Sequence, residues 1–190
     1  AAAKTPTVIR GLAADWPLVK AGLAGDDQAM DYLVSHSRNR SFPANISQLS
    51  GREAIFYDDD MAMNFQMRNG PLAEFLKLIA ENKDNPKPPT IYLSSVDMRD
   101  YFIGLAEANS LPLSPRRLIE SIWIGNRSYI AAHNDEPNNL AICAVGKRRF
   151  TLFPPDQFSN LYLGPLEHNP AGRAVSMLDL EAPDFERFPR

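Results

Sequence analysis

The spacing of apolar residues predicts that the first part of the chain is rich in helices. Four apolar residues recur at intervals of three and four behind a proline, which is tolerated in the first turn, and so predict a helix over 71–83. These residues are Leu72, Phe75, Leu76 and Ile79, behind Pro71. Further helices are expected at 16–24, at 26–36 and at 97–109. Asp26 or Asp27 would cap the second of these, and Asp97 would cap the third.

Short β-type segments punctuated by turn residues dominate the chain from residue 118 onward. Earlier strands are expected at 7–10, 53–58 and 90–96, and a close series at 120–125, 129–135, 139–145 and 148–153. Helices followed by a cluster of strands indicate an α+β fold that ends in a sandwich or barrel. We therefore expect a single domain over 1–190, with a helix-rich part at 1–117 and the first part of a β-barrel core at 118–190. An unclosed barrel would leave an exposed strand edge, so we expect the fold to continue beyond Arg190.

Composition excludes several classes of protein. Hydrophobic residues make up 44% and charged residues 23%, which is typical of a soluble globular protein. The net charge of −3 and the lack of a long basic run argue against nucleic acid and anionic membranes as partners. Cys143 is the only cysteine, so neither an internal disulfide nor a cysteine-rich zinc site can form. No apolar run is long enough for a membrane span and no signal peptide is visible, so we expect a cytoplasmic protein.

His133 and Asp135 carry the clearest candidate chemistry. Residues two apart on a strand point to the same side, so one imidazole and one carboxylate would lie together. They would supply two thirds of a 2-His-1-carboxylate iron site. A structural alternative is that His133 forms a hydrogen bond with Asp135 or with a backbone carbonyl near a barrel rim.

A hairpin predicted at Gly146-Lys147 extends this face. Residues on either side of a two-residue turn lie opposite each other, so Val145 and Arg148 would share a side of the sheet. If the strand stays in phase after Pro137, Asn139 and Arg148 lie on the same side as the His-Asp pair. A metal would partner that pair, and an acidic small molecule would partner the planar guanidinium of Arg148.

Several motifs, in the same order and spacing, make the chain resemble the cupin-like, JmjC-related branch of the iron(II)/2-oxoglutarate oxygenases. The resemblance extends to bacterial proteins akin to the asparaginyl hydroxylase that inhibits hypoxia-inducible factor. The motifs are Ser-Ile-Trp-Ile-Gly-Asn at 121–126, His-Asn-Asp-Glu at 133–136, and Gly-Lys-Arg-Arg-Phe-Thr-Leu-Phe-Pro-Pro at 146–155. The tail at 161–189 and the opening at 6–17 are similar as well.

The resemblance implies a double-stranded β-helix, also called a jelly roll or cupin barrel, with helices packed outside. It implies that His133 and Asp135 bind Fe(II), and that Arg148 and Tyr92 contact the distal carboxylate of the co-substrate 2-oxoglutarate. Asn139 matches an asparagine near the co-substrate and the target. The implied activity is that of a hydroxylase acting on a protein or peptide side chain, or on a small molecule.

Three positions depart from the family pattern. Ile130 stands where relatives have a hydroxyl residue, and Arg148 stands where they often have lysine. The second iron-binding histidine of the family follows the Phe-Pro motif in a Trp-Trp-His-like stretch that is absent up to Arg190. His168 lies in a loop that does not match the ligand position, and we expect it to be a surface residue. With two ligands the chain is expected to hold iron loosely and to have little turnover.

Two alternatives to an active enzyme follow from the incomplete ligand set. The chain could be a non-catalytic cupin-like binding or scaffold module. It could also carry a two-ligand metal site that a partner chain completes, for example in a homodimer.

Overall fold

The computed structural model describes residues 5–50, 55–58, 60–113, 118–135 and 138–189. The contacts between residues divide the chain into two compact units. The first comprises 1–40, 95–122 and 140–152, and the second comprises 41–94, 123–139 and 153–190. The expectation of a single domain over 1–190 stays a prediction.

Two predicted helices open the first unit. Helix α1 (Pro17–Ala24) begins after the extended residue Trp16, with Pro17 in the first turn, where its missing N–H costs no hydrogen bond. Helix α2 (Asp26–His36) follows directly, and buries Ala29 and Leu33. Its N-cap is Gly25 and not an aspartate, so the expected cap is wrong; Asp26 and Asp27 lie in the first turn, where their negative charge favours the helix dipole.

The helix predicted over 97–109 is two short helices, α4 (Met98–Tyr101) and α5 (Leu105–Ala108). Asp97 caps α4 as expected, because its side chain accepts hydrogen bonds from two backbone N–H groups of the first turn. Phe102 is extended and Gly104 is left-handed, with φ 68°, which separates the two helices. Glycine adopts this conformation without steric cost.

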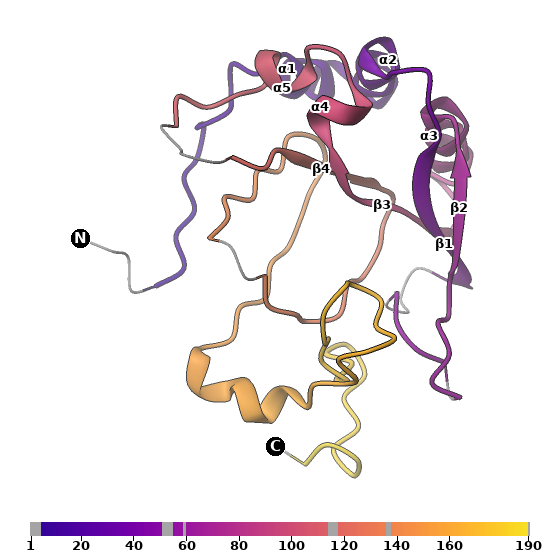
Figure 1. The fold of residues 1–190 in the computed structure, drawn as a ribbon, viewed down its shortest axis with the longest axis vertical. Helices are drawn as coiled ribbons and strands as arrows, with labels where there is room; N and C mark the ends of the chain where they lie inside the picture. Colours follow the sequence, from indigo (N-terminus) through magenta and orange to yellow (C-terminus); the bar gives the residue numbers. More distant parts are fainter. Residues whose placement is uncertain (1–4, 51–54, 59, 114–117, 136–137, 190) are drawn as a thin grey trace. The chain divides into compact units, whose positions relative to one another are not determined.

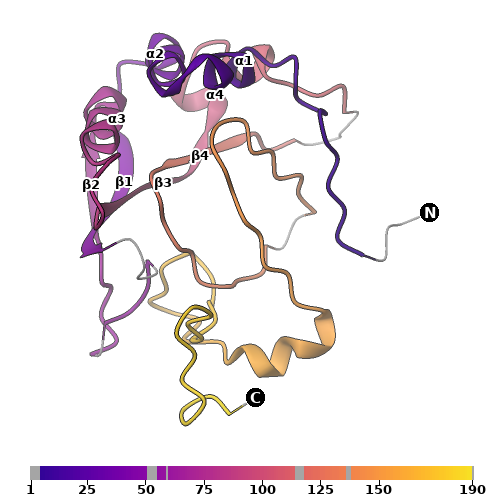
Figure 2. The same cartoon turned by 180° about the vertical axis from the view of Figure 1, so that it is seen from behind.

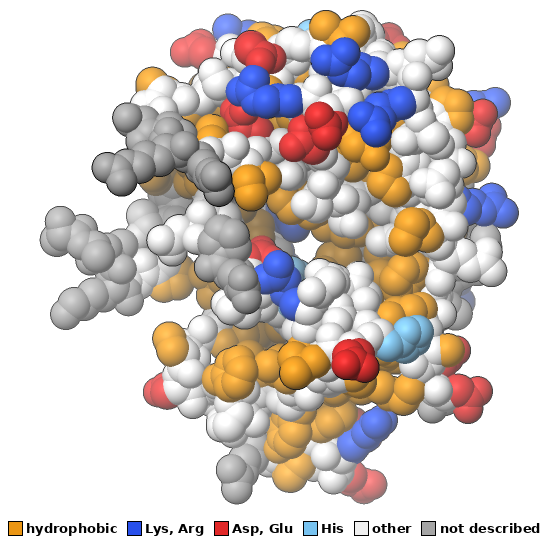
Figure 3. All heavy atoms as spheres, viewed as in Figure 1, with side chains coloured by type: hydrophobic (Ala, Val, Ile, Leu, Met, Phe, Trp, Pro, Cys, Tyr) orange, Lys and Arg blue, Asp and Glu red, His pale blue; other side chains and the backbone are white. Residues whose placement is uncertain are grey.

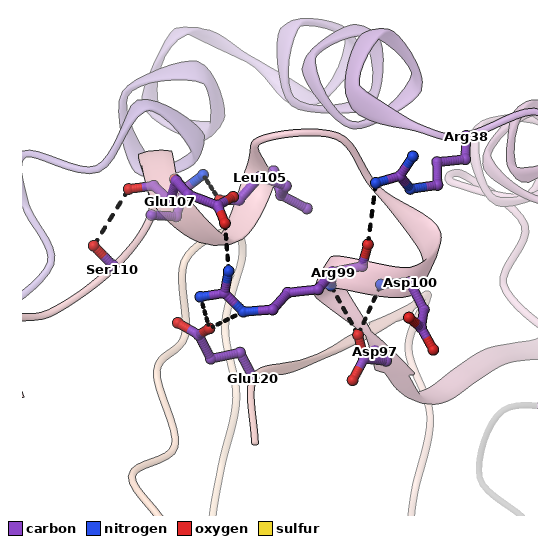
Figure 4. Close-up of polar contacts among 9 residues, drawn as sticks. Arg38, Asp97, Arg99, Asp100, Leu105, Glu107, Ser110 and Glu120 are labelled. Carbon is purple, nitrogen blue, oxygen red and sulfur yellow. Dashed lines mark hydrogen bonds and ion pairs between the residues drawn. The ribbon is translucent and has the colours of Figure 1, made fainter. Parts of the chain in front are cut away.

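Arg99 joins these helices to the segment that leads into the next strand (Figure 4). Its Nε donates to Glu120 Oε2 at 2.9 Å, and its Nη1 pairs with Glu107. The hydrogen bond and the charge of Glu120, followed by the charge of Glu107, raise the pKa of the Arg99 guanidinium. The backbone N–H of Met98 also donates to the Glu120 carbonyl at 2.9 Å, so both side chain and main chain hold this connection.

A four-stranded sheet runs in the order β2-β1-β3-β4 (Figure 1, Figure 2). Its strands are β1 (Phe42–Ser50), β2 (Gln66–Gly70), β3 (Pro89–Asp97) and β4 (Ser121–Gly125). β1 pairs antiparallel with both β2 and β3. The sheet is not closed into a barrel. It is consistent with part of the predicted jelly roll, and the complete jelly roll stays a prediction. β3 and β4 confirm the strands expected at 90–96 and 120–125.

Strands β1 and β2 were not predicted, because β1 contains Pro43 and Asn45, which are rare in strands. The register explains their tolerance. Pro43 lies opposite Asn69 of β2, while pairing with β3 begins only at Asn45, opposite Tyr92. Pro43 therefore needs a partner on one side only, as proline in a sheet usually does.

Helix α3 (Leu72–Glu81) confirms the clearest helix of the sequence, and it lies beside β1 and β2 in both views (Figure 1, Figure 2). Leu72, Phe75 and Leu76 of its apolar stripe are buried. Buried aliphatic and aromatic side chains of this kind each contribute roughly 1.5–3 kcal/mol relative to exposure.

Several predicted strands are wrong. Residues 7–10, 139–145 and 148–153 form no strand, because among the described residues their backbone groups find no partner strand. Phe150 and Leu152 are consequently 54% and 63% exposed. The shared face that we predicted for this hairpin is therefore not formed. Of the strand expected at 53–58, residues 53–54 lie outside the described residues, and Ile55 and Tyr57 make isolated bridges.

The chain after Pro154 contains a 3₁₀-helix, η1 (Pro155–Leu161), which the sequence did not predict. Figure 3 shows apolar side chains exposed over this segment, where Phe158 is 60% exposed.

Among the residues that the structure describes, every helix is too short or too polar to cross a bilayer.

Candidate metal site

The segment that carries His133 and Asp135 is held in place by residues 175–177 of the same unit. His133 and Val175 form an antiparallel bridge, and the Ser176 N–H donates to the Ala132 carbonyl at 2.7 Å. Val175 and Ser176 are each only 1% exposed, so this support is well packed. The predicted strand over 129–135 is reduced to isolated bridges at Ile130 and His133, because the intervening backbone groups have no continuous partner among the described residues.

The ring of His133 forms a hydrogen bond with the backbone carbonyl two residues earlier in the chain. Nδ1 lies 2.8 Å from the Ala131 carbonyl oxygen, and a carbonyl can only accept, so Nδ1 carries the proton of this hydrogen bond. In the neutral ring Nε2 then holds the free lone pair, and metal-binding histidines commonly use this tautomer, with the other ring nitrogen donating to a carbonyl or carboxylate. The hydrogen bond to a backbone carbonyl that we considered as a structural alternative is thus present, and it is compatible with metal binding at Nε2.

Asp135 brings a carboxylate oxygen toward this nitrogen. Oδ1 lies 3.9 Å from His133 Nε2. Nitrogen and oxygen ligands sit about 2.0–2.2 Å from a divalent metal, so two donors on one cation can be up to about 4 Å apart. The separation fits a shared cation, and the side chains of His133 and Asp135, 27% and 48% exposed, remain accessible to one.

Two further side chains surround the carboxylate. The amide Nδ2 of Asn139 donates to Asp135 Oδ2 at 3.4 Å. Arg173 Nη1 lies 3.6 Å from Asp135 Oδ1 and donates to the Asn134 carbonyl at 2.6 Å. Sequence reasoning did not find Arg173, because it is 39 residues beyond Asn134 and belongs to no motif; only the folded chain brings it here.

A third protein ligand is not found within the described part of the chain, where no group of three or more His, Cys, Asp or Glu side chains is placed to hold a metal. His168 is exposed in a loop with φ 50°, and its carbonyl accepts a hydrogen bond from the Tyr57 hydroxyl at 2.9 Å. Ile130 forms a bridge with Ile55 and brings no hydroxyl group to the site.

The residues expected to bind the co-substrate are distributed over both units. Tyr92 on β3 and Asn139 belong to the unit that contains His133 and Asp135, whereas Arg148 belongs to the other unit. The guanidinium of Arg148 lies over the ring of Phe150, 4.9 Å from its centroid. The roles of Tyr92, Asn139 and Arg148 toward 2-oxoglutarate stay predictions.

The sequence profile of the cupin-like domain family matches residues 1–190. The chain belongs to this cupin-like family. Its similarity to a protein named for a JmjC domain supports the JmjC-related assignment made from the motifs. The described sheet and the family match together establish a cupin-like domain.

This cupin-like chain is similar to several curated proteins. It is 24% identical to tRNA wybutosine-synthesizing protein 5 of Gallus gallus, over 98% of this chain and 58% of that protein. The protein of the same name in Danio rerio is 28% identical, over 69% of this chain and 43% of that protein. JmjC domain-containing protein F of Dictyostelium discoideum is 23% identical, over 97% of this chain and 48% of that protein.

The chain spans about half the length of these relatives. Two of them carry the name tRNA wybutosine-synthesizing protein 5, while our expectation for this chain is that nucleic acid is not a partner. No partner of this chain is shown, and the expectation stays a prediction.

Proposed function

We propose that this cupin-like chain is part of an iron(II)- and 2-oxoglutarate-dependent oxygenase, in which His133 and Asp135 supply two of the metal ligands. One observation carries the proposal: an imidazole whose Nδ1 is held by a backbone carbonyl faces a carboxylate oxygen 3.9 Å from its Nε2. A neutral imidazole nitrogen and a carboxylate are two thirds of the ligand set of this oxygenase class. A second histidine, from a segment beyond these residues or from a partner chain, would complete it.

Iron(II) with 2-oxoglutarate supplies dioxygen activation, in which one oxygen atom enters the succinate formed on loss of carbon dioxide and the other enters the substrate. The chain's own contribution is to orient the donors. The Ala131 carbonyl keeps the proton of His133 on Nδ1, and Asn139 holds the second oxygen of Asp135. In this proposal Tyr92, in the same unit as the ligand pair, contacts the distal carboxylate of 2-oxoglutarate. A role for Arg148, whose guanidinium fork suits a carboxylate, stays the prediction made from the resemblance.

The substrate that we propose first is a protein or peptide side chain, followed by a small molecule. The names of the tRNA wybutosine-synthesizing relatives add a modified tRNA nucleoside to the substrates worth testing. The net charge of −3 disfavours broad affinity for nucleic acid, so RNA recognition would have to depend on local contacts.

A non-catalytic cupin-like binding module is the second candidate. It is favoured by the absence, within the described residues, of a third metal-binding side chain near His133 and Asp135. A module of this kind would bind a ligand or a partner protein without consuming 2-oxoglutarate.

Succinate formation tests the proposal. The longest protein that carries this sequence is incubated with iron(II), ascorbate and 2-oxoglutarate, and succinate is measured with peptide, small-molecule and tRNA substrates. Turnover should require iron and be abolished in His133→Ala. His168→Asn is a matched control, because asparagine tolerates the left-handed backbone at this exposed position, and it should keep full turnover. Turnover that survives His133→Ala would exclude the proposed ligand, and metal binding without any turnover would favour the non-catalytic module.

A further inference from the structure

Arg173 contacts the candidate metal site with a full positive charge. Its Nη1 donates to the Asn134 carbonyl at 2.6 Å, between the two expected ligands in the sequence. The same nitrogen lies 3.6 Å from Oδ1 of Asp135. Oδ1 is also the atom that lies 3.9 Å from His133 Nε2. A single carboxylate oxygen therefore faces both the imidazole nitrogen and the guanidinium.

These distances place Arg173 and a bound cation in competition. A divalent metal between His133 Nε2 and Asp135 Oδ1 would lie about 2.0–2.2 Å from each donor atom, and so within a few ångströms of the guanidinium. Like charges at such a separation repel, and the repulsion is only partly screened because the Arg173 side chain is 34% exposed.

We propose that Arg173 is an internal competitor of the metal cation at Asp135. In the cation-free chain its guanidinium neutralises the carboxylate, and it has to withdraw from Oδ1 before a divalent cation binds there. The hydrogen bond to the Asn134 carbonyl retains the side chain next to the site during this exchange. The inference rests on the proposed function only in taking His133 and Asp135 as the ligands of a divalent cation.

A purely structural role for Arg173 predicts the opposite result. If the guanidinium served only to brace the backbone at Asn134, its removal would loosen Asp135 and weaken metal binding. Outer-shell partners that orient ligands typically contribute about 10- to 100-fold to metal affinity. The sign of the change in affinity therefore separates competition from support.

The first experiment measures binding of Mn²⁺, a redox-stable probe, by calorimetry to the purified chain and its variants. Arg173→Met keeps the aliphatic stem and removes the charge, so it should bind Mn²⁺ about tenfold more tightly, which corresponds to about 1.4 kcal/mol. Arg173→Lys retains a competing cation and should stay within about twofold of the unaltered chain. Arg149→Met, at an exposed arginine, makes the same change in net charge and should have no effect. Unchanged or weaker binding by Arg173→Met overturns the proposal, and so does a lack of binding by both Arg173→Met and the unaltered chain.

The second experiment needs no variant at Arg173, so a folding defect cannot obscure it. Phenylglyoxal modifies accessible guanidinium groups, and mass spectrometry of peptides reports the rate at each arginine. Mn²⁺ should accelerate modification of Arg173 severalfold and leave Arg149 unchanged, because the metal displaces the guanidinium from Asp135. In His133→Ala this acceleration should disappear. If Mn²⁺ binding depends on His133 but Arg173 does not respond, the inference fails and the proposed metal site stands; Mn²⁺ binding that persists in His133→Ala contradicts the metal site itself.

Discussion

Replacing Ser176 by alanine should weaken both the fold and the proposed metal site, because this serine forms hydrogen bonds within the segment that supports His133. Its Oγ donates to the Leu161 carbonyl at 2.6 Å and accepts from the Leu178 N–H at 3.2 Å. Its backbone N–H donates to the Ala132 carbonyl, one residue before His133. The side chain is buried, since Ser176 is only 1% exposed.

The expected magnitude follows from these two side-chain hydrogen bonds. Each contributes roughly 0.5–1.5 kcal/mol, and each loss leaves a partly buried backbone group without its partner. We therefore expect Ser176→Ala to lower the free energy of unfolding by about 2 kcal/mol. The backbone bond to Ala132 survives in the variant, but its support is less rigid, so Mn²⁺ affinity should fall by about tenfold.

Urea denaturation measures the first effect, and calorimetry with Mn²⁺ measures the second. With a denaturant slope of roughly 2 kcal/mol per molar urea, the unfolding midpoint should fall by about 1 M. Ser159→Ala is the matched control, because Ser159 is exposed. Its free energy of unfolding should change by no more than about 0.5 kcal/mol. A Ser176→Ala midpoint that coincides with the control would refute the reasoning.

Three further predictions concern the ligand pair and each unit separately. Asp135→Ala should lower Mn²⁺ affinity by more than tenfold in calorimetry, because it removes the carboxylate that we propose as the charged ligand beside His133. Asn109→Ala should destabilise the first unit by about 2–4 kcal/mol in urea, because this buried amide accepts from the Leu18 N–H and donates to two oxygens. Burial raises the pKa of Tyr129 above its ordinary value of 10.0. The contribution of the neutral phenol to the free energy of unfolding should therefore be fully present below pH 10 and be lost as the pH rises above it. Tyr129→Phe should flatten that fall in urea midpoints measured from about pH 9 to about pH 11.

Each of these has an outcome that contradicts it. Asn39→Ala, at an exposed asparagine, serves as the control for Asn109→Ala, and equal midpoints for the two would disprove the role of the buried amide. A pH dependence in Tyr129→Phe as steep as in the unaltered chain would show that another group causes it. Undiminished Mn²⁺ binding by Asp135→Ala would remove the carboxylate from the ligand set.

Helices and buried strands were predictable where the pattern of the sequence agrees with the packing. The stripe behind Pro71 buries three of its residues in α3, and the apolar run at 90–96 becomes β3, with Ile91 and Leu93 buried. β1 could not be predicted, since Pro43 and Asn45 disfavour a strand. The strand forms because β2 and β3 pair with β1 along its two edges, a contact that the sequence of β1 alone does not reveal.

The residues from 139 to 153 show the opposite case. Their alternation is typical of strands, but a strand depends on hydrogen bonds to a partner, and the described residues provide none there. The local pattern therefore predicted strands in this part of the chain that the structure does not contain.

The candidate site was predictable only as far as a motif reaches. His133 and Asp135 are two residues apart and could be paired from the sequence alone. The backbone bond that fixes the His133 tautomer and the approach of Arg173 depend on loop geometry and on a contact 39 residues away along the chain. No spacing rule connects such positions.

The bridge between His133 and Val175 also has a kinetic consequence. Contacts between residues distant in sequence require closure of a long loop, and they tend to form late in folding. During synthesis the imidazole and carboxylate leave the ribosome well before the stretch that supports them. The nascent polypeptide should therefore acquire the proposed affinity for divalent ions in a late step, when this stretch docks. Refolding followed by Mn²⁺ binding should lag behind the recovery of helical circular dichroism.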